Sequence, residues 1–314
     1  MKRVAIAAAL ILATAAAFAK TDALSLIPND AVTVGVVHIN QIRSSPLSSM
    51  LFEHTDNVSS NGEADRFLTE AGLDPTKDID VVAVATAPRT ALGHDADVVV
   101  LADGRFNIDR LTNALITRGA VRKNGYFLLP ESDSKGAVAF PDSHLAIMGT
   151  ESAVIEALAT RTAGGSTFAS AGFLGGYLAR IDPNATAWAL VDVTRAARLT
   201  GAPHVPRGRD ASGEALAAAV RNISMVGLWA TDTGNALKLG AFGLANDTET
   251  LELLEDTLRG VLSAMRLAVK DSQPDLVSVL RRFDVERTKD SVTINGTIPA
   301  ESLRKVMTKH RAAK

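Results

Sequence analysis

The feature that most constrains the fold is a pattern that occurs twice in the chain. Pro28–Asn40 reads PNDAVTVGVVHIN and Pro183–Thr194 reads PNATAWALVDVT. Each is a prolyl turn followed by a run of alternating apolar residues, which is typical of a β-strand. When the two strands are aligned, His38 falls on Asp192, 154 positions later (192 − 38 = 154). The repeat predicts that the chain contains two related units.

The elements after each stretch follow the same plan. Periodicity indicates the order β-α-β-β-α-β-β-α in both halves, with one additional element in the first. Hairpin signals outnumber βαβ patterns, which favours antiparallel pairing. We therefore expect an α+β fold of two similar halves, each an antiparallel-rich sheet with helices packed on one face. The predicted halves are residues 20–162 and 177–314, joined by a glycine-rich linker at 163–176.

Three helix boundaries follow from capping residues and breakers. Asn107 is expected to cap a helix that runs to about Arg118. Asn246 is expected to begin the long helix Asp247–Lys270, with Glu249 completing a capping box. The dipeptide Asp74-Pro75 is expected to break the helix that precedes it.

The first nineteen residues, Met1–Ala19, predict a signal peptide. A basic start, Lys2-Arg3, precedes an apolar run that is short for a membrane span, and Ala17-Phe18-Ala19 places small residues at a cleavage site. The sequence contains no further apolar stretch of spanning length. We therefore expect an exported protein of the periplasm or the extracellular space, without a transmembrane segment once the signal is cleaved. Retention of the signal as an anchor is the alternative.

Composition excludes several classes of function. The 314 residues include no cysteine, which rules out thiol chemistry and cysteine-ligated metal centres. The net charge is −2, so no overall positive field attracts nucleic acid. Hydrophobic residues make up 46% but aromatic residues only 4%, so the core must be aliphatic.

Two longer segments carry a resemblance to a known group. Residues 25–51 read SLIPNDAVTVGVVHINQIRSSPLSSML, and Phe67–Val84 reads FLTEAGLDPTKDIDVVAV. Together they resemble exported bacterial proteins of unknown function that are built from two related α+β halves. The resemblance covers most of the mature chain and concerns scaffold motifs. It implies no activity and no catalytic residue.

A search for catalytic and metal-binding patterns finds none that points to a reaction. No two of the six histidines have the spacing of a helical zinc site, and no nucleophile elbow or phosphate loop is present. The nearest metal-like cluster is His94-Asp95-Ala96-Asp97, which is more typical of a polar hairpin end. Trp188 and Trp229 alternate with apolar neighbours, so we expect both in the core. We predict no catalytic residue, no metal and no cofactor.

The most unusual segment is Arg195–Arg209, RAARLTGAPHVPRGR, which holds four arginines and a histidine before any acid. Guanidinium groups recognise carboxylates and phosphates, so the segment is a candidate anion or partner contact. A solvated crossover is the alternative. The candidate contact residues are Arg198, His204, Arg207 and Arg209.

These observations favour an exported, soluble, non-enzymatic protein that acts as a scaffold or binding protein of the cell envelope. Its partner is an unknown envelope protein or ligand, and peripheral association with the envelope is compatible with the sequence. Two alternatives remain open. One is a hydrolase-type enzyme with dispersed carboxylates, and the other is a carrier of an apolar ligand held between the sheets and the helix Asp247–Lys270.

Overall fold

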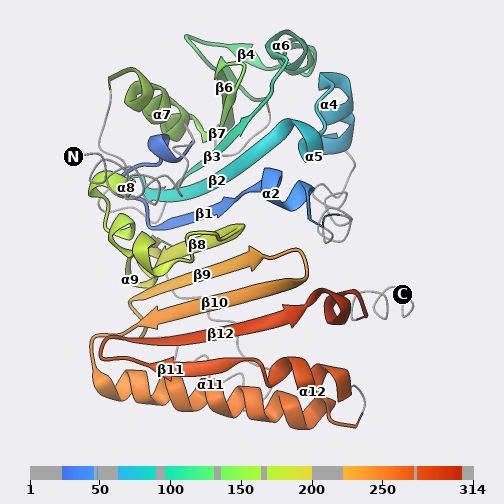
Figure 1. Ribbon diagram of the computed structural model, residues 1–314. Coiled ribbons are helices and arrows are strands. Elements are labelled where there is room, and N and C mark those ends of the chain that lie inside the picture. Colours follow the sequence, from blue (N-terminus) through green and yellow to red (C-terminus); the bar gives the residue numbers. More distant parts are fainter. Residues whose placement is uncertain are drawn as a thin grey trace, which may run out of the picture.

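One antiparallel sheet organises the protein (Figure 1). The computed structural model describes residues 23–45, 48, 63–89, 96–130, 136–163, 168–199, 222–271 and 274–305. In that part of the chain the sheet has twelve strands, and the α+β class with antiparallel pairing is confirmed. The strands are β1 (Thr33–Val37), β2 (Ile79–Pro88), β3 (Ala96–Gly104), β4 (Val121–Arg122), β5 (Phe127–Leu128), β6 (Gly136–Asp142), β7 (Leu145–Thr150), β8 (Ala187–Asp192), β9 (Met225–Asp232), β10 (Ala236–Leu244), β11 (Asp284–Arg287) and β12 (Ser291–Pro299).

The helices of the described part are short, with the exception of α11. Asp74, Asn107 and Asp247 each cap a helix by accepting a hydrogen bond from a backbone amide of its first turn. Asn107 accepts a hydrogen bond from the Arg110 amide at 3.1 Å, as predicted. The helices are η1 (Leu24–Leu26), α2 (Ile39–Arg43), α4 (Glu63–Ala71), α5 (Pro75–Asp78), α6 (Ile108–Thr117), α7 (Glu151–Ala163), α8 (Phe168–Ala171), η3 (Leu174–Arg180), α9 (Val193–Leu199), α11 (Thr248–Val269) and α12 (Pro274–Leu280).

One predicted boundary is shifted by a residue, and another gains a second role. The cap of α11 is Asp247 rather than Asn246, because the Asp247 carboxylate accepts from both the amide and the hydroxyl of Thr250. Asp74 ends the stretch after α4 as expected, but it also begins α5, with Pro75 in the first helical turn where a missing N–H costs nothing.

The strand order is β11-β12-β10-β9-β8-β1-β2-β3-β7-β6-β5-β4. Read outward from the centre, β1-β2-β3-β7-β6 has the same plan as β8-β9-β10-β12-β11. At the centre, β1 pairs with β8, and Gly35 lies opposite Ala189, which is 154 positions later. These features support the duplication that the repeat predicts, and the division into two halves remains a prediction.

The β1–β8 pairing joins the two predicted sheets into one. The largest apolar cluster therefore extends across both halves. The predicted linker contributes to it, because Phe168 is fully buried and its ring lies 6.3 Å from that of Trp188. Phe173 is half exposed and packs edge to face on Tyr177.

The sheet has two faces that are covered differently. We call the first the core face; it carries the buried side chains of Val34, Val36, Trp188 and Leu190 under η1, α7, α8 and η3. We call the second the groove face. There, α4 and α6 pack against β3 and β7 at one side, and α11 and α12 pack against β11 and β12 at the other. Helices thus lie on both faces, whereas one face was expected, because α4 and α6 bury Ala102 and Ala146 while α7 covers the opposite side of the same strands.

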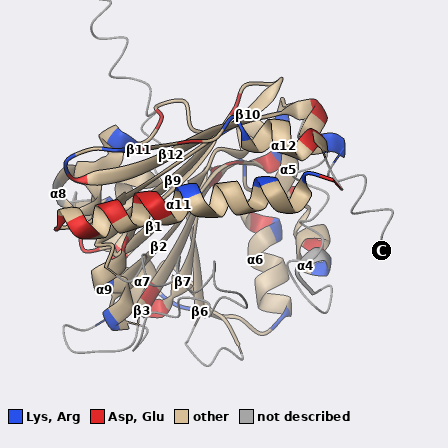
Figure 2. Ribbon diagram, turned by 90° about the horizontal axis from the view of Figure 1, so that it is seen from below, with Lys and Arg blue, Asp and Glu red and all other residues tan. Residues whose placement is uncertain are grey.

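Helix α11 is held against the edge strand by charge as well as by apolar contacts. Its acidic residues gather toward its N-terminal end (Figure 2). Arg287 of β11 contacts Glu255 at 2.8 Å and Glu252 at 3.3 Å, and Arg259 donates to the carbonyl of Val285. These contacts fix α11 as one border of the groove face.

Candidate functional site: an apolar groove between two helix groups

The arginine-rich candidate is only partly placed. Arg198 lies exposed on α9, whereas His204, Arg207 and Arg209 are outside the described residues. Arg195, which precedes them, donates to the carbonyl of Asp30 at 2.8 Å. The predicted anion or partner contact therefore remains a prediction. The predicted signal peptide, Met1–Ala19, is also outside the described residues.

The polar residues that end the two repeated strands start helices. His38 occupies the cap position of α2, its amide donates to the Thr186 carbonyl at 2.8 Å, and burial lowers the pKa of its imidazole. Asp192 is buried and accepts from the Arg195 amide at 2.9 Å at the start of α9. Both residues therefore mark the exit from the sheet.

In the described part of the metal-like cluster, the side chain of Asp97 makes structural hydrogen bonds. His94 and Asp95 are outside the described residues. One oxygen of Asp97 accepts from Thr150 at 2.7 Å, Ser152 at 2.6 Å and Arg89 at 2.9 Å. Burial raises the pKa of Asp97, but these donors outweigh it and the pKa is lowered. In the described ranges, no group of three or more His, Cys, Asp or Glu could hold a metal ion.

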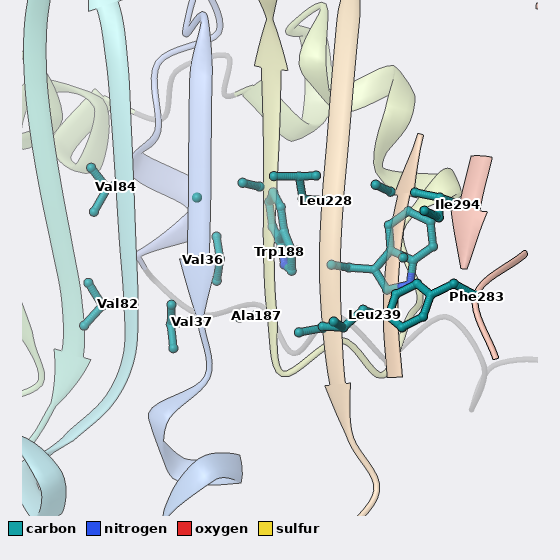
Figure 3. Close-up of a pocket in the computed structure, with 16 residues that line it drawn as sticks. Val36, Val37, Val82, Val84, Ala187, Trp188, Leu228, Leu239, Phe283 and Ile294 are labelled. Carbon is teal, nitrogen blue, oxygen red and sulfur yellow. The ribbon is translucent and has the colours of Figure 1, made fainter. Parts of the chain in front are cut away.

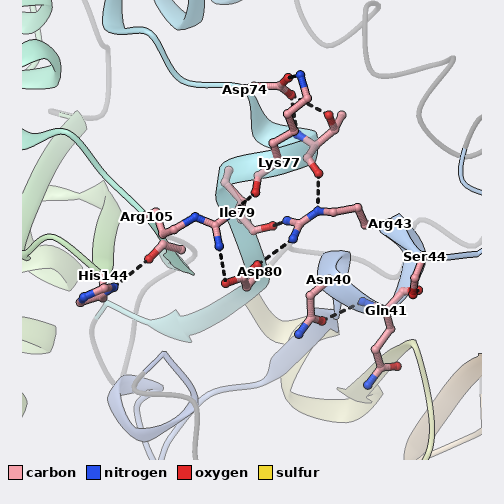
Figure 4. A network of polar contacts seen from close by, with 12 residues as sticks. Asn40, Gln41, Arg43, Ser44, Asp74, Lys77, Ile79, Asp80, Arg105 and His144 are labelled. Carbon is pink, nitrogen blue, oxygen red and sulfur yellow. Dashed lines mark hydrogen bonds and ion pairs between the residues drawn. The ribbon is translucent and has the colours of Figure 1, made fainter.

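A network of charged residues joins α2, α5 and β2 (Figure 4). The Arg43 guanidinium donates to the carbonyls of Thr76 at 2.6 Å and Ile79 at 2.7 Å, and contacts Asp80 at 3.1 Å. Arg105 approaches the other oxygen of Asp80 at 4.0 Å and donates to the carbonyl of Lys77. Every nitrogen of Arg43 is engaged, so we interpret this network as a clamp that fixes α5 on the sheet.

The strongest candidate site is an apolar groove over the centre of the groove face (Figure 3). Its volume is about 600 Å³, and it lies between the two helix groups of that face. Among the residues that the structure describes, no charged side chain borders it. The lining residues are Gly35, Val36, Val37, Val82, Val84, Ala187, Trp188, Ala189, Leu228, Trp229, Ala230, Leu239, Gly240, Ala241, Phe283 and Ile294.

Small residues form the floor of the groove. Gly35 lies opposite Ala189 across the β1–β8 pair, and Ala187 lies opposite Ala230 across the β8–β9 pair. Because side chains alternate along a strand, these residues share the groove face, and the floor follows β8. The bottom of the groove therefore consists of the Cα hydrogens of glycine and the methyl groups of alanine.

Larger apolar side chains form the walls. Val37, Val82 and Val84 stand on the side of β1 and β2, and Leu228 and Leu239 stand on the side of β9 and β10. β1 and β9 are two strand spacings apart, about 10 Å. An α-helix with side chains is about 10–12 Å wide, so the trough suits an extended chain rather than a helix.

Phe283 closes the groove on the side of α12. A Cβ atom placed on Gly296 would lie 2.3 Å from the Phe283 ring, so the ring lies flat on that glycine. Because Gly296 has no side chain, the Phe283 ring can pack there and form an aromatic wall at the far side of the groove.

The groove was not among the site residues predicted from the sequence. A signal was present, because β8 alternates small residues with large ones: Ala187 and Ala189 with Trp188 and Leu190. That alternation predicts a strand with unequal faces, but it does not reveal which face helices leave uncovered.

No protein-family model and no curated protein matches the chain. Solved structures that resemble it are crystal forms of TP0453, a Treponema protein. Form III matches with a TM-score of 0.49 at 13% identity, over 93% of this chain and 99% of that one. Form I gives 0.46 at 13% and form IV gives 0.45 at 14%, each over 93% of this chain and 98% of the other. Similarity at this level carries no functional assignment. Within the described residues, no helix has both the length and the apolar character to cross a bilayer.

Proposed function

We propose that the protein is an exported, non-enzymatic binding protein that carries an elongated apolar ligand, such as an acyl chain, in the groove. The observation that supports this most strongly is a groove of about 600 Å³ whose lining, as far as the structure describes it, holds no charged side chain. Ligand sites typically have about 300–1,000 Å³ and a predominantly apolar lining. The proposal adopts the apolar carrier, which the sequence left as one of two alternatives.

The exposure of the walls favours a ligand over a merely structural hollow. Val84 is 40% exposed and Leu228 is 48% exposed, although both belong to central strands. Burial of apolar surface is worth about 25 cal/mol per Å², so a chain laid over these residues would gain free energy from both partners. A methylene chain contributes about 0.8 kcal/mol per buried CH₂ group.

The chemistry of the groove gives no support to the hydrolase alternative. A general acid or base must come within about 3 Å of the proton it transfers. The described residues that line the groove include no carboxylate, histidine or hydroxyl side chain. The charged network nearest α2 is engaged in its own hydrogen bonds. Binding is therefore the function that this site supports best.

The predicted export of the chain supports a role as a carrier of an apolar ligand. The predicted signal peptide would deliver the chain to an aqueous space outside the cytoplasm. An apolar ligand crosses such a space only when a protein shields its surface from water. We propose the periplasm or the extracellular space as the location, and the envelope as the source of the ligand.

The test uses the fluorescence of Trp188 and Trp229, the only tryptophans in the chain, which both lie on strands that form the groove. A dibrominated stearate should quench their fluorescence, and unlabelled stearate should compete. Ala189→Leu, which fills the floor of the trough, should weaken the affinity at least tenfold. The matched control is Ala159→Leu, an exposed position on α7 on the other face of the sheet.

The proposal would be abandoned if dibrominated stearate failed to quench the tryptophan fluorescence, or if the Ala189→Leu and Ala159→Leu variants bound it equally well. Ala187→Leu provides a second filling variant, so a folding defect in one variant leaves the test intact. Circular dichroism identifies any variant that fails to fold.

A further inference from the structure

A second pocket lies on the core face, near the end of β12 and beside η3. Its volume is about 510 Å³, and its lining mixes charge, amide and aromatic groups. We propose that this polar pocket binds an anionic sugar, at a site that shares only Trp229 and Leu239 with the apolar groove. The side chains that carry the proposal are Trp229, Lys238, Arg282, Asp284, Asn295 and Thr297.

Part of the charge around the pocket is already engaged. Arg180 contacts Asp290 and donates to the Ser291 hydroxyl at 3.2 Å, and its guanidinium lies 5.7 Å from the centre of the Phe242 ring. The two oxygens of Asp182 accept from the Asn184 amide and the Thr231 hydroxyl, each at 2.9 Å. These two residues shape the rim of the pocket and have little left to offer a ligand.

The charge that remains is positive. Within the described residues, the side chains of Lys238 and Arg282 make no hydrogen bond and no ion pair, although both border the pocket. The remaining carboxylate is that of Asp284, and one of its oxygens accepts from the Val285 amide at 3.0 Å. Two available cations against one partly engaged anion favour a negatively charged ligand.

Trp229 supplies a flat surface in the same pocket. A Cβ atom on Gly240 would lie 2.1 Å from the indole ring, so the indole lies directly on that glycine. The Phe242 ring, 6.3 Å away, packs against it. Trp229 is half-buried and borders the pocket, so its position is fixed before a ligand arrives. Preorganised aromatic side chains give contact area at a small cost in entropy.

These groups together select the class of ligand. A simple inorganic anion would use the cations but leave the indole, Asn295 and Thr297 without a role. A sugar ring places an apolar face on the indole and presents hydroxyls to the amide, the hydroxyl and the Asp284 carboxylate. An acidic group on that ring would meet Lys238 and Arg282. An amino acid zwitterion fits less well, because its ammonium group would depend on the Asp284 carboxylate alone, and one oxygen of that carboxylate already accepts from the Val285 amide.

The test compares trigalacturonate with neutral galactotriose by titration calorimetry on the full mature chain. Trigalacturonate should bind and galactotriose should not bind in the same concentration range. Each of Lys238→Met and Arg282→Gln should weaken trigalacturonate about tenfold, the effect of one lost charge-assisted hydrogen bond. Arg281→Gln, a neighbouring exposed arginine outside the pocket, is the matched control and should bind normally.

The proposal would be overturned if trigalacturonate and galactotriose bound equally well. It would also be overturned if Arg281→Gln weakened the affinity for trigalacturonate as much as Arg282→Gln does. Tighter binding of inorganic phosphate or of a dipeptide than of trigalacturonate would overturn it as well. Absence of any binding would also overturn it. The groove variant Ala189→Leu should bind trigalacturonate like the parent protein, which separates this site from the carrier function.

Discussion

The two faces of the central strands use the same alternation for different purposes. In β8, Trp188 and Leu190 point to the core face and are almost completely buried. Ala187 and Ala189 point to the groove face and remain partly exposed. The comparison teaches that one strand can supply large side chains to the core and small ones to a ligand site. Stability and binding are thereby assigned to different residues of the same segment.

The largest expected effect tests this division directly. Leu190→Ala removes a fully buried side chain and should lower the free energy of unfolding by about 2–5 kcal/mol. Leu228→Ala removes the same atoms from the neighbouring strand, but on the groove face, where the side chain is 48% exposed. It should cost about 1 kcal/mol or less, and weaken stearate binding instead.

Urea unfolding of both variants, read from circular dichroism, provides the measurement. Equal losses of stability for the two leucines would break the comparison, because the groove face would then be as important to folding as the core face. An unchanged stearate affinity of the Leu228→Ala variant would also contradict the comparison, because the groove face would then make no contribution to binding.

A smaller loss of stability is expected when the charged network that joins α2, α5 and β2 is disrupted. Arg43→Met removes the donors to Thr76 and Ile79 and the contact with Asp80. The free energy of unfolding should fall by about 1–3 kcal/mol, because two carbonyls and a carboxylate lose partners. Arg105→Met is the graded control, since its longer contact with Asp80 and greater exposure predict about 0–1 kcal/mol.

Both clamp variants should bind stearate like the parent protein, since neither residue borders the groove. A loss of affinity in Arg43→Met without a loss of stability would reassign the clamp to the binding site.

The smallest effect concerns acid. Hydrogen bonds from Lys77 and Thr76 lower the pKa of Asp74 from 3.8 to about 2. A carboxylate with a depressed pKa in the folded state stabilises the protein above its unfolded pKa, and that contribution is lost as the pH falls from about 4 toward 2. The side chain is 41% exposed, so solvent screening keeps the effect small.

Asp74→Asn keeps an oxygen for the Thr76 amide but cannot ionise. Its deficit in the urea midpoint relative to the parent protein should therefore shrink as the pH is lowered from 5 to about 2. A deficit that stays constant over this range would show that the charge of Asp74 makes no contribution.

The sequence predicted the local features of this fold and missed those set by distant contacts. The strand containing Trp188 and the Asn107 cap depend on neighbouring residues, and both are where the pattern placed them. The pairing of β1 with β8 joins residues that are 150 to 158 positions apart (187 − 37 = 150; 191 − 33 = 158), and no local signal specifies it. Phe168 shows the same limit, because its glycine-rich surroundings gave no sign that a distant strand would bury it.

The groove was missed for a related reason. The alternation of large and small residues identified which side chains of β8 share a face. Whether that face is covered depends on helices from other parts of the chain, which the pattern of β8 does not report. The two tryptophans were expected in the core. Trp188 is buried there, whereas Trp229 is only partly covered and borders both pockets.

The pairing between β1 and β8 has a mechanical consequence. Five residue pairs join the strands on either side of this line, and the floor of the trough crosses it at Gly35 and Ala189. Adjacent strands in a sheet are rotated relative to each other by about 20–25°. Because the two walls stand on opposite sides of this seam, its twist sets the angle at which one wall crosses the other, and hence the direction in which a bound chain must turn along the trough.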